Sequence, residues 1–404
     1  MYCFTALVAL VVSVSAYQSN NDVSVQQAPR LVCYHTNWAF MRAEPMNFTP
    51  DQIDPNMCTH LIYSFAKINP TSFLLEPYEP TDTEGPNYYK VFNDLKMLNS
   101  ALKTLLAVGG WTHASEGFTD MVLTPESRKI FIDDSIAYLR RYGFDGLDLD
   151  WEYPTQRGGK PSDKAGYTAL CKELREAYQA EADATGQERM LVTMAIPGGE
   201  WTINDGYEIE PLGRYLDFAN LMSYDLHGSW EWEKHHHTPL YEGPGDSSTD
   251  KMLVLDYVIN KWINGGMPAH KLIMGLGMYG RTWKRGSSCA INTPGEGAGP
   301  AGQWTGEPGF WAYYEVCGKL KSGMAYTWDS ARKVGFGCNT ETNEWVGYDD
   351  ERSLDEKISF MKSNGLGGGM IWALDLDDYT GTQCDAGPWP LMTVVKKESS
   401  KVVI

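Results

Sequence analysis

Three acidic residues, Asp148, Asp150 and Glu152, are spaced two positions apart in the first half of the chain. In a β-strand this spacing points all three carboxyl groups to one face and the apolar residues between them to the other. An amphipathic edge strand shows the same alternation, but carboxylates on one face repel one another. Such a row is useful where a shared proton or a raised pKa is needed. We therefore expect a strand that carries acid–base chemistry.

Short apolar runs alternate with amphipathic stretches along the chain, which is the pattern of βα units. A helix is predicted directly before the acidic strand, with Thr124 as N-cap, Pro125 at its first position and Gly143 as its stop. Eight strands with helices between them favour an α/β fold of the (β/α)₈ TIM barrel type over a doubly wound sheet. The predicted strands are residues 30–37, 59–67, 103–108, 146–152, 191–196, 218–223, 272–278 and 369–373.

A long connection separates the seventh and eighth predicted strands. It contains about 90 residues, far more than one helix needs. Residues 281–355 are rich in Gly, Trp and Tyr, and we expect them to form a small α+β insertion domain. The catalytic barrel would then comprise residues 30–280 and 356–398, followed by a tail at residues 399–404.

The amino terminus has the pattern of a secretory signal. Residues 1–16 contain a short apolar run and end in the small-residue sequence Val14-Ser15-Ala16. The run is too short for a transmembrane helix, which needs about 20 apolar residues. We expect cleavage after Ala16, a disordered lead-in at residues 17–29, and a secreted, extracellular protein with no membrane association.

The cysteine content and the net charge further restrict the class of protein and its partners. The chain has eight cysteines, of which Cys3 leaves with the signal, so at least one of the others is unpaired. An exported chain forms disulfides, although the sequence alone does not assign their partners. The formal net charge of −18 argues against nucleic acid as a partner. Asn47 begins an N-glycosylation sequon.

Several aromatic residues follow predicted strands, where a barrel gathers its active site. Trp38, Trp111, Trp230 and Trp372 occupy such positions, and sugar rings stack on flat aromatic faces. Core packing is the alternative role, because most of the 14 tryptophans cannot contact a ligand. We assign Trp201, Trp262, Trp283 and Trp389 to the core or the surface.

The sequence DGLDLDWEYP at residues 145–154 reproduces the DxxDxDxE signature of glycoside hydrolase family 18, the chitinases and chitinase-like lectins. Two further segments match the family, namely Gly109-Gly110-Trp111 and Met222-Ser223-Tyr224-Asp225. The resemblance extends from residue 31 to about residue 391 and is closest to animal secreted chitinases of the chitotriosidase and acidic mammalian chitinase kind. It implies that the insertion forms one wall of a substrate cleft.

The resemblance also implies roles for the acidic residues. Glu152 would be the general acid that protonates the glycosidic oxygen and later activates water. Asp150 would hold the acetamido group of the substrate, with Asp148 tuning Asp150. Tyr224 would donate its hydroxyl to the acetamide oxygen, and Asp225 would contact the sugar near the cleavage point. The acetamide oxygen itself would attack the anomeric carbon, which makes the family an exception among two-carboxylate glycosidases.

The same resemblance places further residues around the sugar. Trp372 would form the floor beneath the sugar that adjoins the scissile bond, and Glu307 lies where relatives have a cleft-edge carboxylate. Thr112 departs from the asparagine of close relatives and puts one sugar hydrogen bond in doubt. The expected substrate-binding residues are Tyr34, Phe65, Trp38, Gly110, Trp111, Met222, Trp230, Tyr279, Arg281 and Trp372.

Disulfide pairs are implied in the same way, Cys33 with Cys58 and Cys317 with Cys384. A further hypothesis pairs Cys289 with Cys338 within the insertion, which leaves Cys171 as a buried thiol on a helix.

Histidines are interpreted as non-catalytic. We expect a structural role for His227, and a solvated loop for the run of residues 235–237, because three consecutive histidines cannot converge on one ion. No metal or cofactor is expected.

Two functions remain. The first is an endo-acting chitinase that hydrolyses β-1,4-linked N-acetylglucosamine polymers, working as a monomer on chitin and chitooligosaccharides. The second is a catalytically silent lectin of the same fold. Silent relatives usually replace the terminal glutamate of the acidic row, as do related signalling proteins. Because Glu152 is present here, the sequence favours the enzyme.

Overall fold

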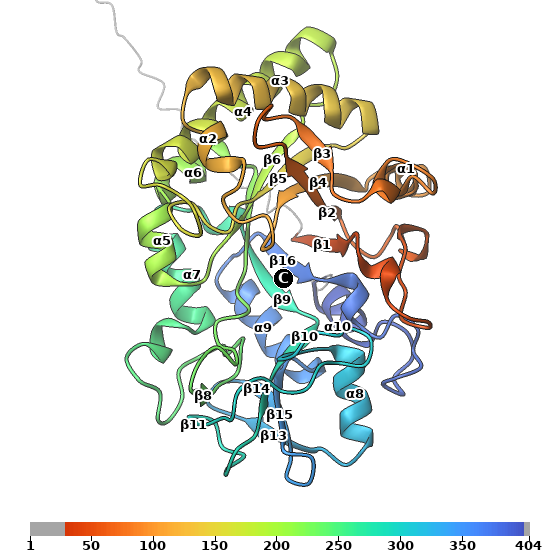
Figure 1. The fold of residues 1–404 in the computed structure, drawn as a ribbon, viewed down its shortest axis with the longest axis vertical. Coiled ribbons are helices and arrows are strands. Elements are labelled where there is room, and N and C mark those ends of the chain that lie inside the picture. The colour runs from red at the N-terminus through yellow and green to blue at the C-terminus, as the bar shows by residue number, and fades with distance from the viewer. Residues whose placement is uncertain (1–28, 400–404) are drawn as a thin grey trace, which may run out of the picture.

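The computed structural model describes residues 29–399 and shows a closed barrel with a second sheet at one end (Figure 1). The predicted signal peptide, residues 17–28 of the lead-in and residues 400–404 of the tail lie outside the described residues. Within the described part of the chain, no helix combines the length and the apolar composition needed to cross a bilayer.

Eight parallel strands form the barrel. β1 closes it by pairing with both of its neighbours, so that Val32 lies opposite Met370 on one side and opposite His60 on the other. All eight predicted strands are confirmed, with ends that agree to within two residues. The strands in chain order are β1 (Arg30–Thr36), β2 (His60–Ile68), β4 (Lys103–Gly109), β5 (Gly146–Asp150), β6 (Leu191–Ile196), β7 (Phe218–Leu221), β9 (Leu272–Gly277) and β16 (Gly368–Trp372).

Helices follow most of these strands and cover the barrel (Figure 1). Helix α3 begins and ends as predicted: the Thr124 side chain accepts a hydrogen bond from the Ser127 N–H at 3.2 Å, and Gly143 ends the helix with a φ of 83°. Ile132 and Leu139 of this helix are buried. The helices are α1 (Tyr88–Asp94), α2 (Phe118–Met121), α3 (Pro125–Tyr142), α4 (Asp163–Thr185), α5 (Glu200–Gly206), α6 (Ile209–Tyr215), α7 (Leu255–Asn264), α8 (Tyr313–Lys321), α9 (Glu351–Ser363) and α10 (Pro390–Ser399).

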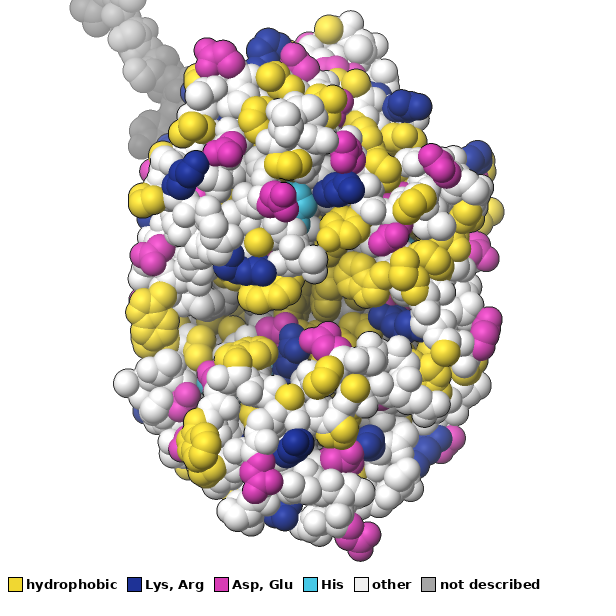
Figure 2. Space-filling view, in the orientation of Figure 1, with side chains coloured by type: hydrophobic (Ala, Val, Ile, Leu, Met, Phe, Trp, Pro, Cys, Tyr) yellow, Lys and Arg dark blue, Asp and Glu magenta, His cyan; other side chains and the backbone are white. Residues whose placement is uncertain are grey.

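A five-stranded antiparallel sheet is inserted between β9 and β16. It begins with Tyr279, two residues earlier than the predicted insertion, because Tyr279 pairs with Ala312 in this sheet. In the same view, Figure 2 shows a groove across the middle of the molecule, lined by hydrophobic side chains, on the barrel side of this sheet. The sheet order is β12 (Phe310–Ala312), β10 (Tyr279–Lys284), β15 (Glu344–Tyr348), β14 (Val334–Asn339) and β13 (Ala325–Asp329).

Two short antiparallel pairings complete the strands. β3 (Leu75–Pro77) pairs with the end of β2 at the barrel edge. β8 (Glu233–Lys234), which follows β7, pairs with β11 (Thr293–Pro294), which follows β10. The second pairing connects a barrel loop to the inserted region.

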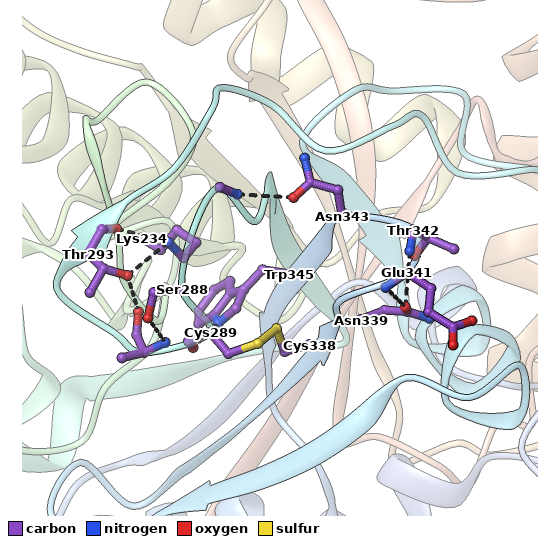
Figure 3. Close-up of a disulfide and its surroundings, with 12 residues drawn as sticks. Lys234, Ser288, Cys289, Thr293, Cys338, Asn339, Glu341, Thr342, Asn343 and Trp345 are labelled. Carbon is purple, nitrogen blue, oxygen red and sulfur yellow. Dashed lines mark hydrogen bonds between the residues drawn. A yellow bond between two sulfur atoms is a disulfide. The ribbon is translucent and has the colours of Figure 1, made fainter.

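Three disulfides join distant segments. Cys33 pairs with Cys58 and Cys317 with Cys384, as the resemblance implies. Cys289 pairs with Cys338 and holds the loop after β10 against β14 (Figure 3). The Trp345 indole N–H donates to the carbonyl of Cys289 at 3.0 Å. Cys171 is a buried free thiol on α4, and burial raises its pKa beyond the ordinary thiol range.

Candidate active site

The deepest member of the acidic row is Asp148 on β5. Its side chain is fully buried and accepts three hydrogen bonds, from the Tyr34 hydroxyl at 2.6 Å, the Thr193 hydroxyl at 2.5 Å and the Asn220 amide at 3.1 Å. Burial raises the pKa of Asp148 to about 6, although these hydrogen bonds oppose the rise. Strands β1, β6 and β7 therefore all contribute to holding one carboxyl group inside the barrel.

Asp150 and Glu152 are the second and third members of the acidic row, and Glu152 is the last. Burial, followed by the charges of Glu152 and Asp148, raises the pKa of Asp150 well above its ordinary value. Its Oδ1 atom is buried and has no hydrogen-bond partner among residues 29–399. Burial also raises the pKa of Glu152 to about 7. Because both groups have raised pKa values, the pair retains a proton near neutral pH, and such a pair can donate it to a substrate oxygen.

Glu152 lies just beyond the strand that was predicted to contain it. β5 ends at Asp150, whereas the sequence analysis extended it to Glu152. At this end of the strand the Gly110 N–H donates to the Asp150 carbonyl at 2.8 Å. Glu152 is consequently at the carboxyl end of the strand, where barrels gather their reactive groups.

A second carboxylate, Asp225, follows β7 and is bound by residues of the inserted sheet. Its oxygens accept from the Tyr279 hydroxyl at 2.6 Å and from Arg281 Nε and Nη2 at 2.7 Å each. Burial alone would raise its pKa, but the charge and hydrogen bonds of Arg281 hold the pKa of Asp225 below the ordinary range. Asp225 therefore stays ionised, in contrast to the β5 pair.

Aromatic rings gather around Trp372, the last residue of β16. The ring centroid of Trp372 lies 5.4 Å from that of Tyr34, 6.0 Å from that of Phe65 and 6.4 Å from that of Trp38. Phe65 and Trp38 also stack on each other at 6.1 Å. Four of the predicted sugar-binding residues therefore form one cluster, and Tyr34 connects it directly to Asp148.

The glycine pair at the end of β4 is required by close backbone approach. A Cβ atom on Gly109 would lie 2.1 Å from the Asp150 carbonyl oxygen, and one on Gly110 would lie 2.7 Å from the Phe65 ring. Both glycines have positive φ values, 117° and 85°. Any side chain here would displace the acidic strand or the aromatic cluster.

Two predicted tryptophans stand outside that cluster, with exposed faces. Trp111 is 61% exposed, and the guanidinium carbon of Arg157 lies 3.6 Å from its ring centroid. Trp230 is equally exposed, and the guanidinium carbon of Arg281 lies 5.3 Å from its ring centroid. Arg157 was missed by the sequence analysis, since nothing near it in the sequence indicates a contact with Trp111.

The remaining predicted positions lie around these groups. The Tyr224 hydroxyl is buried and 3.7 Å from the Met370 sulfur, and the Met222 N–H donates to Ile196 at 2.8 Å. Glu307 is 62% exposed and lies 3.6 Å from Arg281. Thr112 is exposed beside Trp111.

The interpretation of residues 235–237 as a solvated loop is wrong. His235, His236 and His237 are all buried, and burial lowers the pKa values of His236 and His237. His236 Nε2 lies 2.9 Å from the Tyr348 carbonyl, and His237 Nδ1 lies 3.7 Å from Asp225. Residues far away in the sequence supply these contacts, so the polar run itself did not indicate burial.

His227 is buried as well. Its ring stacks on that of His235 at 3.9 Å, and its Nδ1 lies 3.0 Å from Glu231. Trp262 and Trp283 are fully buried, whereas Trp201 is 56% exposed.

Comparison with known proteins identifies the family. A family model described as glycosyl hydrolases family 18 matches residues 30–377, which include the acidic row, Asp225 and Trp372. The chain belongs to glycosyl hydrolase family 18. Chitotriosidase-1 of Mus musculus is 41% identical to it over 373 residues, which are 92% of this chain and 78% of the mouse protein.

Solved structures that resemble this chain include a protein described as a pseudo-chitinase and others described as chitinases. Human YKL-39, described as a pseudo-chitinase with retained chitooligosaccharide binding properties, is 39% identical with a TM-score of 0.87, covering 93% of this chain and 100% of that one. The group IV chitinase of Ostrinia furnacalis is 34% identical, also with a TM-score of 0.87, covering 92% and 100%. Since the family 18 fold fits both equally well, only the site residues can discriminate between enzyme and lectin.

Proposed function

We propose that this family 18 protein is a secreted, endo-acting chitinase that hydrolyses β-1,4-linked N-acetylglucosamine polymers. The observation that carries the proposal is Glu152. It stands at the end of the acidic row, burial raises its pKa to about 7, and its charge helps to raise the pKa of the neighbouring Asp150. A glutamate in this state is suited to protonating a glycosidic oxygen near neutral pH.

The reaction would proceed with the substrate as its own nucleophile. The acetamide oxygen attacks the anomeric carbon while Glu152 transfers its proton to the departing glycosidic oxygen, so that the C–O bond breaks and an oxazolinium-like ring forms. The Glu152 carboxylate then takes a proton from water, and the resulting hydroxide opens the ring with net retention. The acetamide stays attached to the sugar throughout.

Other residues would position the acetamido sugar. Asp150, whose Oδ1 lacks a hydrogen-bond partner in the described part of the chain, would accept a hydrogen bond from the acetamide N–H. Asp148, fixed by Tyr34, would tune Asp150 from below. Tyr224 would turn its hydroxyl from the Met370 sulfur to the acetamide oxygen, which is a stronger acceptor.

The sugar ring itself would stack on aromatic faces. Trp372 would lie beneath the reacting sugar, with Tyr34, Phe65 and Trp38 supporting it. Trp111 and Trp230 would bind further sugars, and Arg281 and Asp225 would contact polar groups near the scissile bond. Gly110, Met222 and Tyr279 would complete the walls.

Export is proposed on two grounds. The three disulfides suit an oxidising compartment, and residues 1–16 have the pattern of a signal peptide. Glycosylation at Asn47 is part of this proposal, and so is a monomeric state.

A chitooligosaccharide-binding lectin is the second candidate, favoured by the equal structural similarity to the human pseudo-chitinase. The test compares product release from N-acetylchitohexaose by the wild type and by Glu152→Gln. We expect dimers and trimers from the wild type only, with binding retained by the variant. Binding by both without products from either would support the lectin.

A further inference from the structure

The loop after β5 has an unusual backbone around Arg157. Thr155 and Arg157 both have positive φ values, 70° and 50°, although neither is a glycine, and Gly158 follows with 98°. Such conformations cost free energy in residues that carry a Cβ atom, and they concentrate at functional sites. The loop therefore holds the backbone of Arg157 in a conformation that an unconstrained chain would rarely adopt.

Hydrogen bonds from buried groups fix the loop. Asp163, at the start of α4, accepts from the backbone N–H groups of Thr155 at 3.3 Å and of Lys160 at 2.7 Å. The Ser115 hydroxyl donates to the carbonyls of Tyr153 at 3.3 Å and Gln156 at 2.7 Å. Asp163 and Ser115 are buried, so both ends of the loop are anchored to the barrel.

The Arg157 side chain bridges two parts of the site. Its guanidinium lies over Trp111, 3.6 Å from the ring centroid. Its Nη1 atom donates to the carbonyl of Trp111 at 2.7 Å and to the carbonyl of Glu152 at 2.9 Å. One side chain thus supports one face of the exposed indole and ties its backbone to that of the acidic residue.

The positive charge of Arg157 also acts on the Glu152 carboxyl group. Its charge lowers the pKa of Glu152, against burial and the nearby charge of Asp225, which raise it. The charge of Glu152 in turn raises the pKa values of Asp150, Tyr153, Tyr207 and Tyr224. Among these described neighbours of Glu152, Arg157 supplies the positive charge, and its removal takes that charge away.

We propose that Arg157 is a positioning residue that fixes the indole face of Trp111 relative to Glu152, so that a sugar stacked on Trp111 is aligned with the proton donor. The chemical class of ligand is a neutral N-acetylated sugar unit of the substrate, bound on the Trp111 face opposite Arg157. This proposal deepens the proposed function and rests on it.

The test uses two readouts on the full chain. Binding of N-acetylchitohexaose is measured by calorimetry in the inactive Glu152→Gln background, with and without Arg157→Ala. We expect the dissociation constant to rise by about two- to fivefold, the range of an exposed cation–π contact. The pH dependence of kcat/KM is measured for the single variant Arg157→Ala, and its alkaline limb is expected to move to higher pH.

Two further variants control for unrelated effects. Arg157→Lys keeps the positive charge but loses the planar guanidinium. Its kcat/KM should therefore fall over the same alkaline pH range as that of the wild type, whereas its binding of N-acetylchitohexaose should stay weak. Arg352→Ala removes a similar stack elsewhere, since Arg352 lies 3.9 Å from the Trp328 ring centroid on the inserted sheet, and should change neither readout.

Unchanged binding and an unchanged alkaline limb in Arg157→Ala would overturn the proposal, and so would a change in only one of them. If Arg157→Ala does not fold, Arg157→Lys provides the test. The proposal then requires that Arg157→Lys binds the oligosaccharide more weakly than the wild type but has the same alkaline limb in kcat/KM. If the wild type releases no product, the proposed function fails, whereas the binding comparison still tests whether Arg157 supports the Trp111 platform.

Discussion

Replacement of Arg281 by alanine should destabilise the protein through Asp225. In the wild type two nitrogens of Arg281 bind two oxygens of Asp225 at 2.7 Å each, and the side chains are 15% and 35% exposed. The variant leaves Asp225 with the Tyr279 hydroxyl at 2.6 Å as its remaining strong donor. A carboxylate that has lost its cation in a half-buried site is expected to be costly.

The size of the effect follows from this geometry. A hydrogen bond to a charged group contributes about 1.5–3 kcal/mol when it is well protected. Because Asp225 is about one third exposed, solvent screens the pair, and we discount the two bonds together to about 2 kcal/mol. For a domain of about 370 residues, with an unfolding entropy of about 0.8 kcal/mol/K, this lowers the melting temperature by about 2–3 °C.

A double-mutant cycle isolates the interaction. Arg281→Ala, Asp225→Asn and the double variant are compared with the wild type by thermal unfolding, and the coupling energy is expected to be about 2 kcal/mol at pH 7. The pKa of Asp225 is depressed in the folded state, so its stabilising contribution is present above the ordinary aspartate pKa and is lost as the pH falls through the folded value. The coupling should therefore shrink in acid.

Two outcomes would refute this reasoning. A coupling energy near zero at pH 7 would mean that Arg281 stabilises only by packing on Trp230, Tyr279 and Phe310, whose ring centroids lie 5.3, 5.6 and 5.3 Å away. A coupling that does not decrease as the pH falls would mean that the charge of Asp225 is not its source.

Three other outcomes are expected. The kcat/KM for N-acetylchitohexaose should fall as the pH rises through the pKa of Glu152, about 7, because the general acid must be protonated; a constant value up to pH 9 would contradict this. Gly109→Ala should unfold the protein or lower its stability by more than about 3 kcal/mol, since the new Cβ would meet the Asp150 carbonyl. Gly85→Ala, with φ of 57° and open space around it, is the matched control and should cost only about 1 kcal/mol in the same unfolding assay. Trp372→Ala should weaken oligosaccharide binding, measured by calorimetry, more than it lowers the melting temperature; normal affinity would assign Trp372 to packing alone.

Much of the fold and part of the site were predictable because their signals are local. Strand and helix positions follow from the spacing of apolar residues and from stop signals such as Gly143 within a few residues of each element. The acidic row is equally local, since a period of two places Asp148 and Asp150 on one face of β5 whatever surrounds it. The resemblance to a known family added proposed roles for residues far apart in the chain.

The tertiary structure decided what depends on distant partners. His236 is buried, and its ring forms a hydrogen bond with the carbonyl of Tyr348, which is 112 positions away in the sequence. Because this partner is so distant, the run of histidines alone did not indicate a buried position. Arg157 contacts Trp111 across 46 positions, and only the anchored loop brings the two together. The sequence by itself determined that Asp148 and Asp150 share one face of a strand, because backbone geometry repeats every two residues, but it did not show that β5 ends before Glu152. Their pKa values, and the cations that oppose them, were decided by burial and by long-range packing.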